Sequence, residues 1–445
     1  MVTVCLSSFL AIDFMSYYKN PAVSHGDRIG AVQLSALDQT PHYVQAVMKV
    51  GTHNQVVARE DVYAANGMKL LQKGARVDNR LWESLGKHKL AKPLDLLLAG
   101  SDCVDHLALS QQMETLLAAS PLLATMLDRA GGIRGLKTVL ATVRLPAALA
   151  FRLTIMRDEA ATTYRHSLRV AIGAYCIGLK CRLSAEQQRD LLLAAFCHDI
   201  GEMHTDPAIL QPGRLIEGSE RRFIHVHPIT GLVILQQFNA IPPAVIQAVQ
   251  QHHERMDGSG YPQRDRGGAI GILGRILAIA ETLDAVSGRL DPGQIHIVFR
   301  MHQGRLDPDG MQALKELLPR TMAETSGHVI EPDLAPRIGR LAAVLNDWPA
   351  VRSEIMAGPP ASPLQFVIER MAQVQSLACQ AGIAPDLLEL LDLSGDDAVV
   401  IGDLHTAMDE LGRLLDGLAF EIDRCMPVGG AYGGMSTRII DFLLH

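Results

Sequence analysis

Two adjacent histidines lie at the end of a helical stretch and run directly into a glycine-rich loop, from His252 to Pro262. Glycines at 258 and 260 stop the helical pattern, which is typical of a functional loop. More imidazoles and one carboxylate precede it along the chain, at His166, His198, Asp199 and His227. Imidazole nitrogen and carboxylate oxygen together suit borderline transition metals such as iron, manganese and zinc. The pattern predicts a helical, metal-dependent hydrolase.

The predicted metal ligands fall at helix ends. A capping box that starts at Ser184 predicts a helix that reaches His198–Asp199 and ends at Gly201. Pro242–Pro243 opens the next helix, which ends in His252–His253. Adjacent helix residues diverge by about 100°, so a single metal is poorly placed to bind both histidines. Two metals side by side could each take one, and the sequence therefore predicts a dinuclear centre.

Composition and charge limit the class of protein. With 445 residues, 48% of them hydrophobic, the chain can bury more than one core. A net charge of −7 and a pI near 6.2 argue against a nucleic-acid polymer as partner, because a phosphate backbone calls for a basic surface. Seven scattered cysteines fit a reducing compartment, and no apolar stretch approaches the roughly 20 residues of a membrane span. We expect a cytoplasmic protein without a membrane span, for which a small phosphate ligand remains allowed.

The chain divides into segments of different pattern. Val62–Tyr63 and Lys69–Leu71 flank the turn Asn66–Gly67, which predicts a β-hairpin in a small N-terminal domain. From about residue 101 apolar residues recur at helical spacing, and Gly358–Pro360 marks a linker before a C-terminal helical bundle. The predicted fold is mainly α, with an apolar N-terminal extension over 1–24, a small β-containing domain over 25–98, a helical domain over 101–345, a linker over 346–363 and a helical region over 364–445.

The histidine motifs resemble those of the HD-GYP branch of the HD phosphohydrolase superfamily. The resemblance lies in His166, His198–Asp199, His227–Pro228 and the stretch from His252 to Pro262, and it covers about residues 115–345. Residues 61–74 are similar to the small domains that often precede HD-GYP domains. The resemblance implies an HD-type, all-α domain that hydrolyses the bacterial second messenger cyclic di-GMP to linear pGpG and on to GMP.

The resemblance also implies a ligand set for two divalent transition metals, iron or manganese, with zinc as an alternative. The implied ligands are His166, His198, Asp199, His227, His252, His253 and Glu281, with Asp199 bridging the two metals. Catalytic roles would fall on His198, Asp199 and Glu202. Gly260, Tyr261 and Pro262 would shape the mouth beside the dinucleotide. The implied partner is cyclic di-GMP, and a homodimer or a signalling-protein partner is compatible with this reading.

Four positions depart from the usual pattern of that family. Glu202 stands where lysine is common, and Glu281 stands where aspartate is usual. Thr162 takes the place of a glutamate that some members use for a third metal. The arginine-rich segment that grips phosphate is missing, and only Arg289 lies near its place. These departures affect substrate binding more than metal binding.

Three classes of function therefore stay open. The first is an active HD-GYP phosphodiesterase, and the second is a degenerate, non-catalytic domain that binds cyclic di-GMP or a partner protein. The third is an HD hydrolase of another nucleotide. Glu202 is either a solvated acid at a helix end or a residue that binds or orients the metal ligands. Histidines outside the motifs, such as His204 and His225, are expected to be ordinary surface or core residues.

Overall fold

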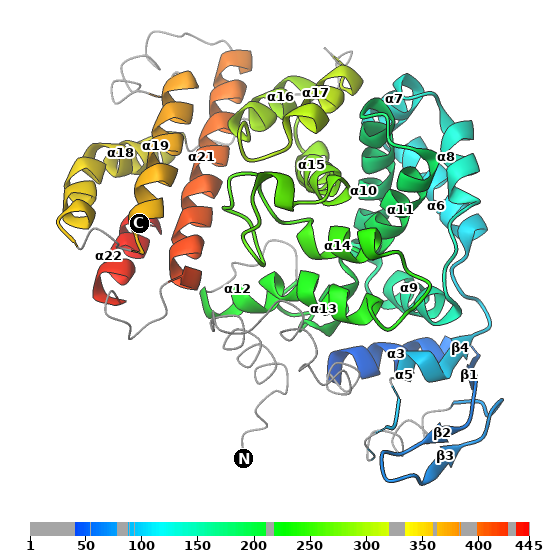
Figure 1. Cartoon of the computed structure of the whole chain (residues 1–445). Coiled ribbons are helices and arrows are strands. Elements are labelled where there is room, and N and C mark those ends of the chain that lie inside the picture. Colours follow the sequence, from blue (N-terminus) through cyan, green and yellow to red (C-terminus); the bar gives the residue numbers. More distant parts are fainter. Residues whose placement is uncertain are drawn as a thin grey trace. The chain divides into compact units, whose positions relative to one another are not determined.

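The computed structural model describes residues 41–53, 55–77, 88, 90–92, 94–210, 218–319, 334–358, 363–381, 383, 398–425 and 433–444. Helices dominate, and the short strands lie in the N-terminal part of the described chain (Figure 1). The predicted mainly α fold with a small N-terminal β region is confirmed. The predicted extension over 1–24 lies outside the described residues.

The chain forms two compact units, Met1–Ala285 with Leu306–Leu318, and Val286–Arg305 with Pro319–His445. This division into two units does not test the domain boundaries predicted from the sequence, which stay a proposal. Among the described helices, none combines the length and the hydropathy that a membrane span requires.

The described N-terminal residues of the first unit combine two helices with two small antiparallel sheets. Its elements are α3 (Pro41–His53), β1 (Val56–Ala58), β2 (Val62–Tyr63), β3 (Lys69–Leu71), α5 (Leu94–Leu97) and β4 (Leu98–Gly100). Strands β2 and β3 form the predicted hairpin, in which Gly67 adopts the left-handed φ of 84° that its turn requires. Strand β1 pairs antiparallel with β4, and Val56 lies opposite Gly100 in this ladder.

The rest of the first unit is built around one long helix, α10 (Ala161–Lys180), which packs against five others. These are α6 (His106–Ala119), α7 (Pro121–Arg129), α9 (Ala147–Glu159), α11 (Ala185–Cys197) and α17 (Pro308–Leu317). Helix α8 (Ile133–Leu140) packs against α11. The predicted capping box is present at the start of α11, where Ser184 and Gln187 satisfy each other's backbone N–H groups.

Of the predicted metal ligands, His166 lies on α10 and His198 caps the end of α11, and the others belong to the part of the chain that follows α11. This part contains several further helices. These are the 3-10 helices η2 (Ile200–His204) and η3 (Gly267–Ala269), and the helices α12 (Gly218–His225), α13 (His227–Leu235), α14 (Pro243–Gln251) and α15 (Ile272–Ser287). Helix α13 packs against both η2 and α14, because it is mostly apolar and buried over its whole length. The first unit thus brings several helix ends close to one another.

The second unit is a helical bundle with its own core. It contains α16 (Pro292–Met301), α18 (Leu334–Met356), α19 (Gln365–Gln380), α21 (Ala398–Cys425) and α22 (Gly433–Leu444). The C-terminal helical region predicted from the sequence is therefore present. Residues 346–356 of the predicted linker belong to α18, because Trp348 and Ile355 are buried in the bundle core and hold the helix together on both sides of Pro349.

Candidate metal centre

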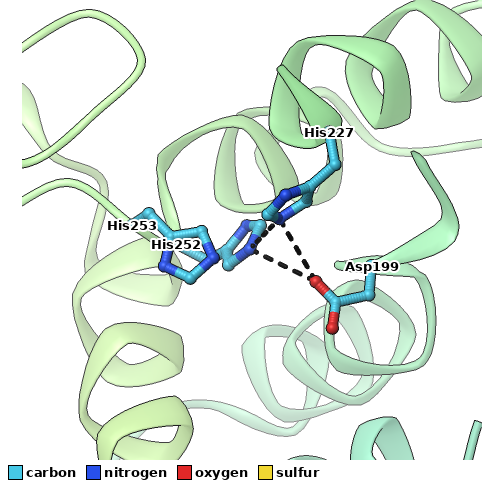
Figure 2. A group of neighbouring side chains, drawn as sticks. All are labelled: Asp199, His227, His252 and His253. Atoms are coloured by element: carbon cyan, nitrogen blue, oxygen red, sulfur yellow. Dashed lines mark hydrogen bonds and ion pairs between the residues drawn. The ribbon is translucent and has the colours of Figure 1, made fainter. Parts of the chain in front are cut away.

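Asp199 lies at the centre of a group of imidazoles and presents a different pair to each of its carboxylate oxygens. Its Oδ2 lies 3.1 Å from Nε2 of His198 and 3.4 Å from Nε2 of His166. Its Oδ1 lies 3.2 Å from Nε2 of His227 and 3.6 Å from Nε2 of His252 (Figure 2). One carboxylate therefore faces two separate sets of nitrogen atoms.

The orientation of three imidazoles is fixed by backbone contacts. Nδ1 of His198, His227 and His252 lies 2.8, 2.6 and 2.6 Å from the carbonyl oxygen three residues earlier. A carbonyl oxygen only accepts, so each Nδ1 donates, and the neutral ring then presents an unprotonated Nε2 to the centre. Nε2 of His227 and Nε2 of His252 lie 3.0 Å apart. Two lone pairs this close call for a cation between them.

His166 is oriented by a carboxylate instead of a carbonyl. Its Nδ1 donates to Asp284 at 2.7 Å, and Asp284 is held by two hydrogen bonds from Arg169 at 2.7 and 2.8 Å. A carboxylate behind a metal-binding histidine fixes its tautomer and raises its basicity. Asp284 and Arg169 were not among the predicted site residues. The signal for Asp284 was its spacing, because residues three apart share one face of a helix and Glu281 is also on α15.

Glu281 contributes the second carboxylate of the centre. Its Oε2 lies 2.9 Å from Nε2 of His166 and 3.3 Å from Nε2 of His198, yet this buried atom accepts no hydrogen bond. Burial raises the pKa of Glu281, but the two histidines hold it well below its usual value. An ionised, buried carboxylate oxygen within 3.3 Å of two imidazole nitrogens is a donor set that suits a metal ion. The residues present therefore fit a divalent cation.

The electrostatics of the centre separate the histidines into two kinds. Burial lowers the pKa of His252 to about 4 and that of His253 well below its usual value. Burial also disfavours the charged forms of His166 and His198, but the neighbouring carboxylates raise their pKa to about 12 and about 10. Asp199 stays ionised, because the imidazoles around it outweigh burial and hold its pKa well below its usual value. The carboxylates thus demand positive charge from protons or from metals.

Two groups of neighbouring side chains could each hold a metal ion. The first contains Asp199, His227, His252 and His253, and the second contains His166, His198 and Asp199. The prediction that the two adjacent histidines diverge is wrong, and both fall in the first group. Helix α14 already ends at Gln251, so His252 and His253 follow the end of the helix, and their ring centroids lie only 4.1 Å apart (Figure 2). The case for two metals rests on Asp199, which belongs to both groups.

Glu202 lies in η2, in the turn after Asp199, and is half-buried. Thr163 donates a hydrogen bond to its Oε2 at 3.3 Å. Burial raises the pKa of Glu202 to about 7, and the nearby charge of Asp199 adds to the effect. These contacts argue against a solvated acid and favour a side chain that faces the metal centre.

The loop after His253 is stabilised by close packing of its own backbone and by hydrogen bonds to the buried Glu254. Glu254 is 1% exposed, and its Oε1 accepts hydrogen bonds from the backbone N–H groups of Gln263 at 2.6 Å and Arg264 at 3.1 Å. Gly260 packs so closely on the backbone of residues 253–255 that a Cβ atom would overlap it. Glycine is therefore required there by close approach of the chain.

Tyr261 lies between two imidazoles. Its ring stacks on His253 with centroids 4.6 Å apart and on His225 with centroids 3.9 Å apart. Both faces of the ring are thus covered, and Tyr261 holds His253 in place. His225, which the sequence reading left as an ordinary residue, is part of this stack. The predicted role of Gly260, Tyr261 and Pro262 at the mouth beside a dinucleotide stays a prediction, as does that of Arg289, which lies in the second unit near Asp409, Glu410 and Arg413.

Comparison with known proteins matches part of the chain to a known family. The model of the HD domain matches residues 153–308. A 3'3'-cGAMP-specific phosphodiesterase of Vibrio cholerae is 38% identical over 155 residues, which are 33% of this chain and 35% of that protein. A cyclic di-GMP phosphodiesterase of Pseudomonas aeruginosa is 31% identical over 146 residues, again 33% of this chain and 35% of that protein. The chain thus spans about a third of the length of these relatives.

A solved structure, an HDG"Y"P protein from Bdellovibrio bacteriovorus, covers 48% of this chain and 69% of its own, with 19% identity and a TM-score of 0.34. The part of the chain that the HD domain model matches includes the candidate metal centre from His166 to Glu281.

Proposed function

We propose that this chain, an HD-domain protein related to HD-GYP cyclic di-GMP and cGAMP phosphodiesterases at moderate identity over a third of its length, is itself a metal-dependent phosphodiesterase of cyclic di-GMP. The products would be pGpG and GMP. The observation that carries the proposal is the position of Asp199, whose two oxygens face two different sets of imidazoles. A carboxylate in this position is suited to bridge two cations.

The ligands divide into two overlapping sets. His166, His198, Asp199 and Glu281 would hold one ion, and Asp199, His227, His252 and His253 would hold the other. Bound there, iron or manganese would lower the pKa of water and withdraw charge from phosphodiester oxygens, which supplies both nucleophile and electrophile. No serine or cysteine nucleophile is needed.

The remaining residues orient these ligands. Arg169 and Asp284 fix His166, and the stack of His225 on Tyr261 fixes His253. The carboxylates that face the centre would repel a phosphodiester in the absence of cations. We therefore expect cyclic dinucleotide binding to depend on metal loading. We also propose a place in the cytoplasm, where cysteine thiols would stay reduced.

A second candidate substrate is 3'3'-cGAMP. The relative that is 38% identical is specific for this dinucleotide, whereas the relative at 31% acts on cyclic di-GMP. Glu202 in place of the lysine common in HD-GYP proteins also keeps the non-catalytic reading open. The two substrates differ in one base, so they are best compared side by side.

Full-length protein made anaerobically with iron(II) or manganese tests the proposal. We expect elemental analysis to find about two metal ions per chain. Both dinucleotides are then assayed on the same preparation, and we expect faster turnover of cyclic di-GMP. Folded protein with almost no metal would contradict the metal centre. Faster turnover of 3'3'-cGAMP would reassign the substrate, and tight binding without turnover would identify a binding domain. If the protein neither binds nor hydrolyses the two dinucleotides, its substrate is another nucleotide.

Exchanging Glu202 for lysine tests how its charge acts on the centre. We expect Glu202→Lys to tighten cyclic di-GMP binding about tenfold, because a cation replaces an anion close to the phosphate. The same change should weaken metal binding, because a positive charge then faces the cations. Calorimetric titration with metal and then with nucleotide measures both effects. Glu202→Gln is the control that removes the charge alone, and unchanged affinities in both variants would show that Glu202 has no part in the site.

A further inference from the structure

The short helix η2 is held from outside the metal centre by the N-terminal helix α3. The ring of Tyr43 on α3 stacks on the ring of His204, with centroids 4.8 Å apart and an interplanar angle of 25°. Arg152 on α9 places its guanidinium carbon 4.4 Å from the centroid of Tyr43 and donates to Nε2 of His204 at 2.8 Å. Figure 1 shows α3 beside α9, in agreement with the contacts between them. We call Tyr43, Arg152 and His204 the α3 clamp.

The α3 clamp is buried to a degree that is unusual for such polar groups. Tyr43 and Arg152 are 0% exposed, and His204 is 6% exposed. A buried guanidinium is costly unless its charge is compensated, and here an aromatic face and an imidazole lone pair do so. Because a guanidinium only donates, Nε2 of His204 must accept. Each of the three side chains therefore contacts the other two, so a change in one alters the packing of both others.

The clamp acts on the segment that carries the central carboxylate. His204 is the last residue of η2, which begins directly after Asp199 and contains Glu202. On its other side η2 packs on α13, where a Cβ atom at Gly201 would collide with the carbonyl of His227. Helix η2 has five residues, and a 3-10 helix rises about 2 Å per residue, so η2 is a short link between the clamp and the centre. A shift at His204 would therefore move Asp199.

We propose that Tyr43, Arg152 and His204 are positioning residues through which the N-terminal domain fixes Asp199, so that undocking of α3 lowers the activity of the metal centre. The expected change in hydrolysis rests on the proposed function, whereas the expected change in manganese affinity does not. None of the three residues lies in either group of side chains that could hold a metal ion. Their effect would be exerted through η2.

Tyr43→Leu in the full chain tests the proposal, because leucine fills space but offers no aromatic face to Arg152 or His204. We expect kcat to fall about tenfold and the Kd for manganese to rise about tenfold, as for other residues that orient metal ligands, with KM for cyclic di-GMP nearly unchanged. Tyr43→Phe keeps the ring and should restore both values. Val62→Ala is the matched control, since Val62 is also 0% exposed but lies on β2, which contacts β3.

The comparison is made at temperatures equally far below the Tm of each variant. If Tyr43→Leu and Val62→Ala then lose activity and manganese affinity to the same extent, the clamp only stabilises the fold and the proposal is overturned. If the unmodified chain hydrolyses no cyclic dinucleotide, the proposed function fails, and the manganese affinities alone decide on the clamp. A weaker affinity confined to Tyr43→Leu would support it.

Discussion

Asp199→Asn is expected to lower hydrolysis by at least about 1000-fold, because it removes the charge shared by two cations. An amide offers one oxygen, and its NH2 group would turn hydrogens toward the imidazole pair that the second oxygen now faces. The metal content should fall with the activity. Steady-state kinetics and elemental analysis on the same preparation measure the two losses.

The control for this change is Asp206→Asn, on the same stretch of chain, where the side chain accepts a hydrogen bond from the N–H of Ala208. We expect this variant to keep its metal and its activity. The Tm of metal-free Asp199→Asn should stay close to that of the unmodified protein. An Asp199→Asn variant with full activity would rule out hydrolysis through this centre.

Gly201→Ala is expected to have the second largest effect, although the change adds only one methyl group. The added Cβ would collide with the carbonyl of His227, so η2 and α13 would have to separate. Overpacking of this kind costs about 1–3 kcal/mol of stability. The separation would also pull Asp199 away from Nε2 of His227, which lies 3.2 Å from its Oδ1. We expect activity to fall about 100-fold, since small displacements of catalytic groups cost that much.

Gly268→Ala serves as the control for the glycine change, because a Cβ at Gly268 meets no atom within 4 Å. Thermal unfolding and activity measured on both variants separate a local collision from a general effect of alanine. Activity retained in Gly201→Ala would mean that η2 can move without disturbing the metal centre.

The histidines that the structure gathers around Asp199 could be singled out because their sequence context is local and carries the motifs of the resemblance. Caps and glycines mark where each helix stops, and His198, His227 and His252 are at or next to those marks. The partners that orient the ligands could not be found in this way. Arg169 meets Asp284 across 115 positions of the chain, and the pairing exists only in the folded state.

The error over the adjacent histidines has a simple physical cause. A sequence pattern does not fix the last residue of a helix. Here that residue decides the chemistry, because α14 ends at Gln251 and His253 is free of the helical spacing that would have turned it away from His252. Pro349 lies inside α18, in a stretch that the sequence predicts as a linker, for a different reason. Burial of Trp348 and Ile355 in the bundle core outweighs the tendency of proline to interrupt a helix.

The backbone contacts of three histidines connect the candidate metal centre to the C-terminal ends of helices. The carbonyl groups that accept from His198, His227 and His252 belong to the last turns of α11, α12 and α14, where a helix has no N–H of its own left to offer. Each imidazole supplies that missing donor with one nitrogen and turns the other toward Asp199. Occupation by a metal leaves these caps intact, because it uses the second nitrogen. The shape of the centre is thereby set by where three helices terminate, before any ion arrives.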